Sequence, residues 1–243
     1  MELAQLLRLS PTSFNKAVIP IAEPAILSWF ELCDAFWGYE GDPGPEKAHA
    51  ELTSGKCSDA FFDCLRVLRH PNLCEILAHQ LVRRLARCNI LQEVARPDWV
   101  IGSAYAAITL SYEVAKVFGA THGFVEKDPT DPAGKRMLWK RMQIPKGAKV
   151  LQVEELITTI GTTREVRRAV QEGNGIPVNF LPIVGALVHR PAELPIAYDG
   201  DMKVVAVIER AVHSWNPAEC PLCKAGSPRF RPKTHWAELT GKK

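Results

Sequence analysis

The sequence lacks the features of a membrane or exported protein. Its apolar runs, such as residues 179–188, fall far short of the roughly 20 residues that a helix needs to cross a bilayer. Residues 1–10 contain a single arginine and lead into Pro11, which does not match the basic, apolar and small-residue layout of a secretory signal. We therefore expect a cytoplasmic protein with no membrane partner.

A surplus of charge and a disulfide framework are also missing. The net charge is only +3, and lysine and arginine are dispersed along the chain, which gives little support for nucleic acid as a partner. Seven cysteines are an odd number, and a chain of 243 residues is long enough to bury its own core without cross-links. This cysteine usage favours reduced thiols, as in a cytoplasmic protein.

Three parts are expected along the chain: an N-terminal helical or hood segment at 1–45, a core domain at 46–212 and an irregular tail at 213–243. Apolar residues between positions 24 and 37 predict a helix that ends at Gly38. A second helix is expected from Asn72, as its N-cap, to about Arg87. The tail is rich in proline, tryptophan and basic residues and shows no clear period.

The core domain alternates short apolar strands with helical stretches. Strands are expected at 99–101, 121–125, 149–153, 178–188 and 203–208, and helices at 104–118 and 162–172. This alternation predicts an α/β fold with a mostly parallel twisted sheet flanked by helices. Ligands of such sheets bind outside the carboxyl ends of the strands.

The most informative stretch is 150–165, where an apolar strand leads into Glu154 and Glu155, a hydroxyl-rich turn and a helix. Adjacent carboxylates can accept hydrogen bonds from ribose hydroxyls and help hold a hydrated divalent cation. Backbone N–H groups at a helix N-terminus favour a phosphate dianion. The stretch thus indicates a phosphorylated pentose, although an acidic turn before a threonine-capped helix without a ligand would look the same.

The layout of 150–163 resembles the 5-phosphoribosyl-1-pyrophosphate (PRPP) motif of the type I phosphoribosyltransferases. Residues 52–62 are similar to the Ser-Gly-Lys segment of orotate phosphoribosyltransferases, 102–105 to their pyrophosphate-side loop, and 220–223 to a tail found in some members. The resemblance covers about 49–232. It implies Mg²⁺-dependent transfer of phosphoribose from PRPP to a base, preferably orotate, in pyrimidine nucleotide synthesis or salvage. A homodimer is also implied.

The resemblance assigns roles to particular residues. The candidates for PRPP are Lys56, Tyr105, Glu154, Glu155, Thr158, Thr159, Ile160, Gly161 and Thr162, with Ser54 as a further pyrophosphate contact. Glu154 and Glu155 would also hold the metal. Phe61 or Phe62 would stack on the base, although either could be a core residue. The candidate catalytic cations on the loop over the pyrophosphate are Lys127, Lys135 and Arg136.

Several family features are absent from this sequence. Residues 126–141 contain no histidine where orotate enzymes carry a Lys-x-His-Gly element, and Thr53 and Ala106 stand where many of them have lysines. Ile160 stands where the family motif has a glycine. Because isoleucine is β-branched, the backbone must have a negative φ at that position. These departures keep two alternatives open: a catalytically weakened regulatory protein that binds PRPP or a nucleotide, and a transferase for a different base.

Cys220 and Cys223 have the spacing of half a zinc site, with His213 and His235 within reach of a folded loop. Structural zinc sites show four ligands, and the sequence offers only one recognisable pair, so a site without metal is favoured. A redox pair is less favoured still, because no helix start is expected after the motif. Cys57 is interpreted as a small packing residue.

Overall fold

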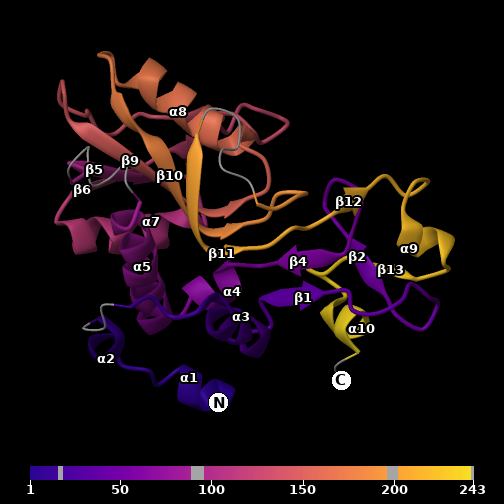
Figure 1. Cartoon of the computed structure of the whole chain (residues 1–243). Coiled ribbons are helices and arrows are strands. Elements are labelled where there is room, and N and C mark those ends of the chain that lie inside the picture. The colour runs from indigo at the N-terminus through magenta and orange to yellow at the C-terminus, as the bar shows by residue number, and fades with distance from the viewer. Residues whose placement is uncertain (16–18, 89–95, 196–201, 242–243) are drawn as a thin grey trace.

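A five-stranded sheet forms the centre of the protein (Figure 1). The structure is a computed structural model that describes residues 1–15, 19–88, 96–195 and 202–241. The strand order is β11-β10-β9-β5-β6, and every neighbouring pair is parallel. The strands are β5 (Trp99–Gly102), β6 (Thr121–Phe124), β9 (Lys149–Ile157), β10 (Asn179–His189) and β11 (Lys203–Glu209).

Helices cover both faces of this sheet, as Figure 1 shows. Helices α5 (Pro71–Ala86) and α7 (Ala107–Phe118) pack on one face, and α8 (Gly161–Gly173) packs on the other. Because side chains alternate along a strand, Leu151 joins the core beneath α5 and α7 while its neighbour Val150 joins the core beneath α8. The expected α/β fold is confirmed.

The N-terminal segment contains α1 (Leu3–Leu6), α2 (Pro11–Asn15) and α3 (Glu23–Leu32). The prediction of one helix reaching Gly38 was wrong. Helix α3 ends at Leu32 because Asp34 adopts a positive φ of 53°, which the short polar side chain tolerates. The following residues form strand β1 (Phe36–Gly38), which pairs antiparallel with β4 (Ala60–Phe62).

Asn72 has a different role from the predicted one. The residue before α5 is His70, and Pro71 occupies the first turn, which suits proline because the N–H groups there have no partner inside the helix. The Asn72 amide instead donates to the carbonyls of Leu7 and Leu9 and so holds the N-terminal segment against α5. Helix α4 (Leu65–Leu68) precedes this junction.

A second, smaller sheet lies beside the core and contains part of the tail. Its order is β12-β3-β2-β13, with β2 (His49–Glu51) and β3 (Cys57–Ser58) joined to β12 (Ser214–Trp215) and β13 (Arg229–Phe230). The tail also forms α9 (Pro221–Lys224) and α10 (Trp236–Thr240). It is therefore more regular than expected, because its strands form only by pairing with β2 and β3, which lie far away in the sequence.

A two-stranded hairpin of β7 (Glu126–Lys127) and β8 (Met137–Leu138) completes the structure. Together with the small sheet, it stands at the end of the core where the parallel strands terminate, so both elements can border a ligand site there. Within the described ranges, none of the helices has the length and apolar character needed to span a bilayer.

Candidate active site

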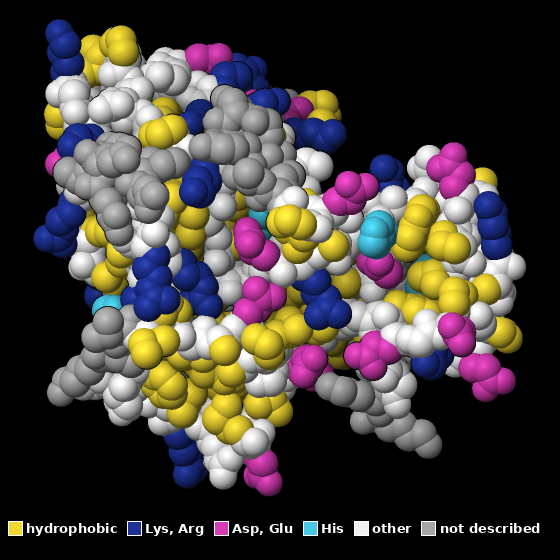
Figure 2. Space-filling view, viewed as in Figure 1, with side chains coloured by type: hydrophobic (Ala, Val, Ile, Leu, Met, Phe, Trp, Pro, Cys, Tyr) yellow, Lys and Arg dark blue, Asp and Glu magenta, His cyan; other side chains and the backbone are white. Residues whose placement is uncertain are grey.

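A large cavity lies between the carboxyl ends of the core strands and the small sheet. Its volume is about 1070 Å³, and its wall includes Glu155 and Thr158 from the core and Lys56 from the turn between β2 and β3. Figure 2 shows the surface hollowed between the two lobes of the molecule. This is the position at which open parallel sheets bind ligands.

A second cavity of about 790 Å³ adjoins the first. It lies between the β7–β8 hairpin and the start of α8, and its wall includes Lys127, Thr162 and Arg168. Lys135 and Thr159 line both cavities, so these two residues mark the border between them.

The two adjacent carboxylates lie in β9 and have different surroundings. Glu154 is only 2% exposed, and its carboxylate accepts hydrogen bonds from the Ser103 hydroxyl and from Gln152 Nε2, the latter at 2.6 Å. Glu155 is partly exposed and lies on the cavity wall. Of the two carboxylates expected to face a ribose, only Glu155 lies on the cavity wall.

Burial shapes the ionisation of both residues. It raises the pKa of Glu154 to about 7, against the hydrogen bonds from Ser103 and Gln152, and the neighbouring Glu155 charge adds to the rise. Burial also raises the pKa of Glu155. The position of Glu154 follows from strand geometry, since successive side chains of β9 point to opposite faces.

The turn before α8 contributes residues to the walls of both cavities. Ile160 has φ −73° and ψ 6°, so the β-branched residue is accommodated with a negative φ as required. Its side chain is buried, which leaves only its backbone to face a ligand. Thr158 and Thr159 line the larger cavity, and Gly161 and Thr162 line the smaller one at the first turn of α8. The first N–H groups of a helix have no acceptor within it and favour an anion.

Phe61 and Phe62 are neighbours in strand β4, so their side chains point to opposite faces of it. Phe62 is buried in the core, with its ring 4.7 Å from that of Phe36 and 6.1 Å from that of Phe30. Phe61 is half-buried on the cavity side, 6.4 Å from the ring of Trp236. Both residues line the larger cavity, and of the two Phe61 has the more accessible ring.

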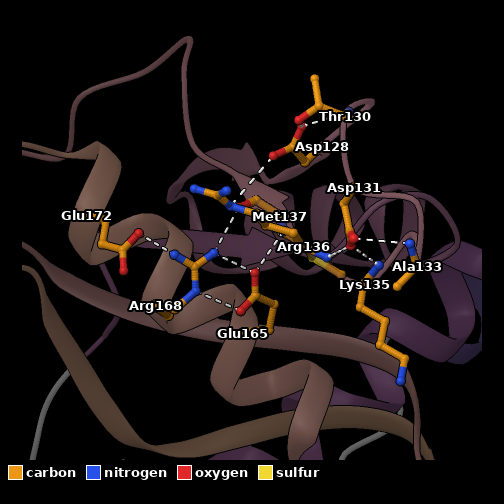
Figure 3. A network of polar contacts seen from close by, with 10 residues as sticks. All are labelled: Asp128, Thr130, Asp131, Ala133, Lys135, Arg136, Met137, Glu165, Arg168 and Glu172. Carbon is orange, nitrogen blue, oxygen red and sulfur yellow. Dashed lines mark hydrogen bonds and ion pairs between the residues drawn. The ribbon is translucent and has the colours of Figure 1, made fainter.

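The loop between β7 and β8 is held in a defined shape, shown in Figure 3. The Asp131 carboxylate accepts backbone hydrogen bonds from Ala133, Lys135 and Arg136 at 2.7–3.0 Å. The Glu165 carboxylate of α8 accepts a hydrogen bond from Met137 N at 2.8 Å. The hairpin is thereby fixed to α8, at the edge of the smaller cavity.

The three predicted loop cations differ in their engagement. Lys127 donates to the Gly134 carbonyl at 3.0 Å, and Arg136 forms an ion pair with Asp128 at 3.5 Å. Lys135 extends away from this network in Figure 3 and lines both cavities. Lys135 is therefore the loop cation best placed to meet a ligand that spans the two.

The remaining sequence candidates lie on the wall of the larger cavity. Lys56 and Ser54 belong to the β2–β3 turn, and Tyr105, 74% exposed, belongs to the loop after β5. Thr53 and Ala106 line the same wall. The two positions at which many orotate enzymes have lysines thus border the cavity. This end of the cavity therefore lacks the two positive charges that those lysines would supply.

Arg190 was missed by sequence reasoning. It follows the carboxyl end of β10, is partly buried and lines the larger cavity, and its Nε has no hydrogen-bond partner among the described residues. Burial lowers the pKa of its guanidinium, which nevertheless stays charged. An arginine directly after a predicted parallel strand was the available signal.

The histidines expected near the cysteine pair lie elsewhere. His213 bonds the Asp59 carboxylate at 2.9 Å, and His235 bonds the Thr234 hydroxyl at 2.7 Å. A helix does start at the motif, contrary to expectation, since α9 begins at Pro221 with Cys220 as its N-cap. This helix is one turn long.

Comparisons with known proteins agree with this geometry. No protein-family model matches the chain. Orotate phosphoribosyltransferase from Pelotomaculum thermopropionicum is 36% identical over 184 residues, which cover 76% of this chain and 87% of that protein. The enzyme of the same name from Caldicellulosiruptor bescii is 32% identical over 186 residues, covering 76% and 88%.

Among solved structures, orotate phosphoribosyltransferase from Aeropyrum pernix superposes with a TM-score of 0.51 at 16% identity, covering 76% of this chain and 93% of that one. At this identity the superposition supports the fold alone. The sequence relatives support assignment to a family, because they exceed 30% identity over most of their own length. This chain therefore belongs to the orotate phosphoribosyltransferase family.

Proposed function

We propose that the protein is a pentosyltransferase that transfers the 5-phosphoribosyl group of PRPP to orotate and releases pyrophosphate, in pyrimidine nucleotide synthesis or salvage. The observation that carries this proposal is the convergence, in one cavity, of an aromatic ring, a partly buried guanidinium, a carboxylate and the residues before a helix N-terminus. Relatives that bear the name of this activity support it.

The phosphoribosyl group is assigned to the end of β9 and the start of α8. The 5-phosphate would accept hydrogen bonds from the N–H groups and hydroxyls between Thr158 and Thr162. The Glu155 carboxylate would accept hydrogen bonds from the ribose hydroxyls. Glu154, held by Ser103 and Gln152, would support this edge from behind rather than contact the sugar.

The base is assigned to the space between Phe61 and Arg190. Stacking on Phe61 would hold a flat pyrimidine ring. Orotate also carries a carboxylate, and a guanidinium binds a carboxylate through two parallel hydrogen bonds. Arg190 is the partly buried cation on this wall, and its guanidinium carries the paired N–H donors that such an interaction needs.

The pyrophosphate is assigned to Lys56, Tyr105 and Lys135. Displacement at the anomeric carbon passes through an oxocarbenium-like state and needs no covalent enzyme intermediate. The protein would contribute chiefly by positioning the two substrates and by neutralising the charge on the departing pyrophosphate. Lys135 is suited to this task because it extends from the hairpin loop into the border between the cavities.

Magnesium is proposed as the cofactor. Mg²⁺ prefers oxygen ligands and is commonly held by one or two carboxylates together with substrate phosphates. Glu155 fits this requirement as a carboxylate on the cavity wall, whereas both Glu154 oxygens already accept hydrogen bonds. When bound, the cation would neutralise charge on the pyrophosphate.

Three further properties, expected from the sequence or from the resemblance, remain proposals. These are a homodimer, a cytoplasmic location, and division into segments at 1–45, 46–212 and 213–243. Sedimentation equilibrium tests the dimer. Limited proteolysis tests the boundaries, and the pairing of β2 and β3 with the tail predicts that cleavage near residue 212 leaves the fragments associated.

Isothermal titration with PRPP and Mg²⁺, followed in the same sample by a panel of purine and pyrimidine bases, tests the proposal. Wild-type protein is expected to bind PRPP and to release pyrophosphate with orotate. Glu155→Gln is expected to weaken the Mg²⁺-dependent binding at least tenfold, by the loss of a charge-assisted interaction of about 1.5–3 kcal/mol. Binding without release for any base would instead identify a regulatory PRPP-binding protein.

A further inference from the structure

Three cysteines and one histidine gather in the small lobe, meaning the sheet β12-β3-β2-β13 together with α9, outside the cavity described above. His49 belongs to β2, Cys57 to β3, and Cys220 and Cys223 to the start of α9. The four candidate ligand atoms, three sulfurs and one imidazole nitrogen, all lie within 4.8 Å of one another. His49 and Cys57 could not be recognised as ligands from the sequence, because they precede the Cys-x-x-Cys pair by more than 160 residues.

The spacing of these atoms fits a single tetrahedral ion. Sulfur at about 2.3 Å and nitrogen at about 2.0–2.1 Å from zinc place neighbouring ligand atoms roughly 3.5–3.8 Å apart. Cys57 Sγ lies 3.5 Å from Cys223 Sγ, and His49 Nε2 lies 3.4 Å from Cys223 Sγ and 3.9 Å from Cys220 Sγ. A disulfide would require sulfurs about 2.05 Å apart.

The hydrogen bonds around His49 leave its Nε2 atom available to a metal. The Ser227 hydroxyl donates its only hydrogen to the Lys47 carbonyl at 2.5 Å. The same oxygen lies 2.8 Å from His49 Nδ1 and must therefore accept a hydrogen bond from it. Neutral His49 is then protonated on Nδ1, and the lone pair of Nε2 points toward the sulfurs. Metal-binding histidines are oriented by such outer hydrogen bonds.

The surroundings also suit a structural ion. His49, Cys57 and Cys220 are fully buried and Cys223 is partly buried, and four protein ligands would leave no coordination position for a substrate. The Cys220 sulfur accepts a hydrogen bond from Cys223 N at 3.5 Å within the one-turn α9. Thiolate and imidazole ligands in a closed tetrahedron favour zinc over magnesium or calcium.

The small lobe has little else to stabilise it. Its strands are two or three residues long, and its buried apolar cluster consists of Cys57, Cys220 and Leu222, with Tyr39, Trp215 and Cys223 partly buried against it. Lobes with so small a core commonly depend on a disulfide or a metal. A metal here would tie the β2–β3 hairpin to the tail.

We propose that His49, Cys57, Cys220 and Cys223 bind one structural zinc ion that fastens the tail to the β2–β3 hairpin. The ion would also position the cavity wall, because Lys56 directly precedes Cys57 and lines the large cavity. The proposal stands on these four side chains and is independent of the reaction catalysed.

Metal analysis of the full-length protein tests this directly. Protein purified under reducing conditions, without added metal, is expected to contain about one zinc per chain. Cys220→Ser and Cys223→Ser should each lose most of it. Cys74→Ser, at a buried cysteine of α5 outside the cluster, is the matched control and should keep the metal. A wild-type chain that carries no zinc and gains none on titration would overturn the proposal.

Two measurements on wild-type protein remain decisive even if the variants fail to fold. Exchange with Co²⁺ should give the strong visible bands of a tetrahedral thiolate site, and a weak octahedral spectrum would contradict the assignment. A strong chelator should expose the tail to protease while the core sheet stays protected, because the metal and the fold of the lobe are coupled. Unchanged cleavage after complete metal removal would equally contradict it.

Discussion

Glu154 and Glu155 are neighbours in β9, yet only Glu155 lies on the cavity wall, while the Glu154 carboxylate is enclosed by Ser103 and Gln152. The pair therefore divides into one residue exposed to a ligand and one that belongs to the interior. This difference gives the two residues separate and measurable consequences.

The first consequence concerns stability against pH. The pKa of Glu154 is raised from 4.5 to about 7 by burial, so the folded state holds a proton that the unfolded state releases. Its contribution to the free energy of unfolding is complete below pH 4.5 and is lost as the pH rises through 7. At about 1.4 kcal/mol per pKa unit, the loss amounts to roughly 3–3.5 kcal/mol. Urea unfolding between pH 5 and 8 should show this decline in wild type and much less of it in Glu154→Gln, whereas equal slopes would refute the assignment.

The second prediction separates the two phenylalanines. Phe61→Ala should raise the KM for orotate roughly tenfold, in keeping with about 0.5–1.5 kcal/mol from stacking in addition to buried area. Its effect on stability should be small, because the ring is half exposed. Phe62→Ala removes a core ring and should lower the free energy of unfolding by about 3–5 kcal/mol. Steady-state kinetics and urea unfolding of both variants provide the comparison, and reversed effects would place the base elsewhere.

The third prediction assigns the orotate carboxylate to Arg190. Arg190→Met should raise the KM for orotate about 10- to 100-fold, the equivalent of a charge-assisted hydrogen bond of about 1.5–3 kcal/mol. Any activity with uracil, which lacks the carboxylate, should change far less. Arg231→Met is the control, because Arg231 forms an exposed ion pair with Glu51 outside the cavity. Equal losses with both bases would argue against this pairing.

The fourth prediction concerns the hairpin loop. Lys135→Met should lower kcat by about 10²-fold, if its charge stabilises the departing pyrophosphate as a preorganised donor does. Arg136→Met should have a small effect, since Arg136 already pairs with Asp128. Single-turnover rates at saturating PRPP measure both. A larger loss for Arg136 than for Lys135 would mean that the loop rearranges before the reaction.

Much of the core was predictable because its signals are local. Strand β5 and helix α8 follow from periodicity and from the residues at their ends, and the negative φ of Ile160 follows from its branched side chain. The order Glu154, Glu155 and then a threonine turn likewise marks the candidate phosphate site in the sequence alone.

The rest depends on partners far away in the chain. Strand β1 reads as helix until β4 is placed beside it, and the tail forms strands only against β2 and β3. Periodicity likewise does not reveal that His49 meets Cys223, or which of two adjacent side chains of a strand faces the ligand. These facts come from tertiary packing, which overrides local propensity.

The most direct test of the account is the initial rate of pyrophosphate release from PRPP by the wild-type protein with Mg²⁺ and orotate. We expect release that requires both PRPP and orotate and matches the nucleotide formed. We also expect Arg190→Met to slow the reaction at low orotate while leaving PRPP binding intact. Tight PRPP binding without pyrophosphate release, under conditions where a relative of the same family turns over, would contradict the central claim.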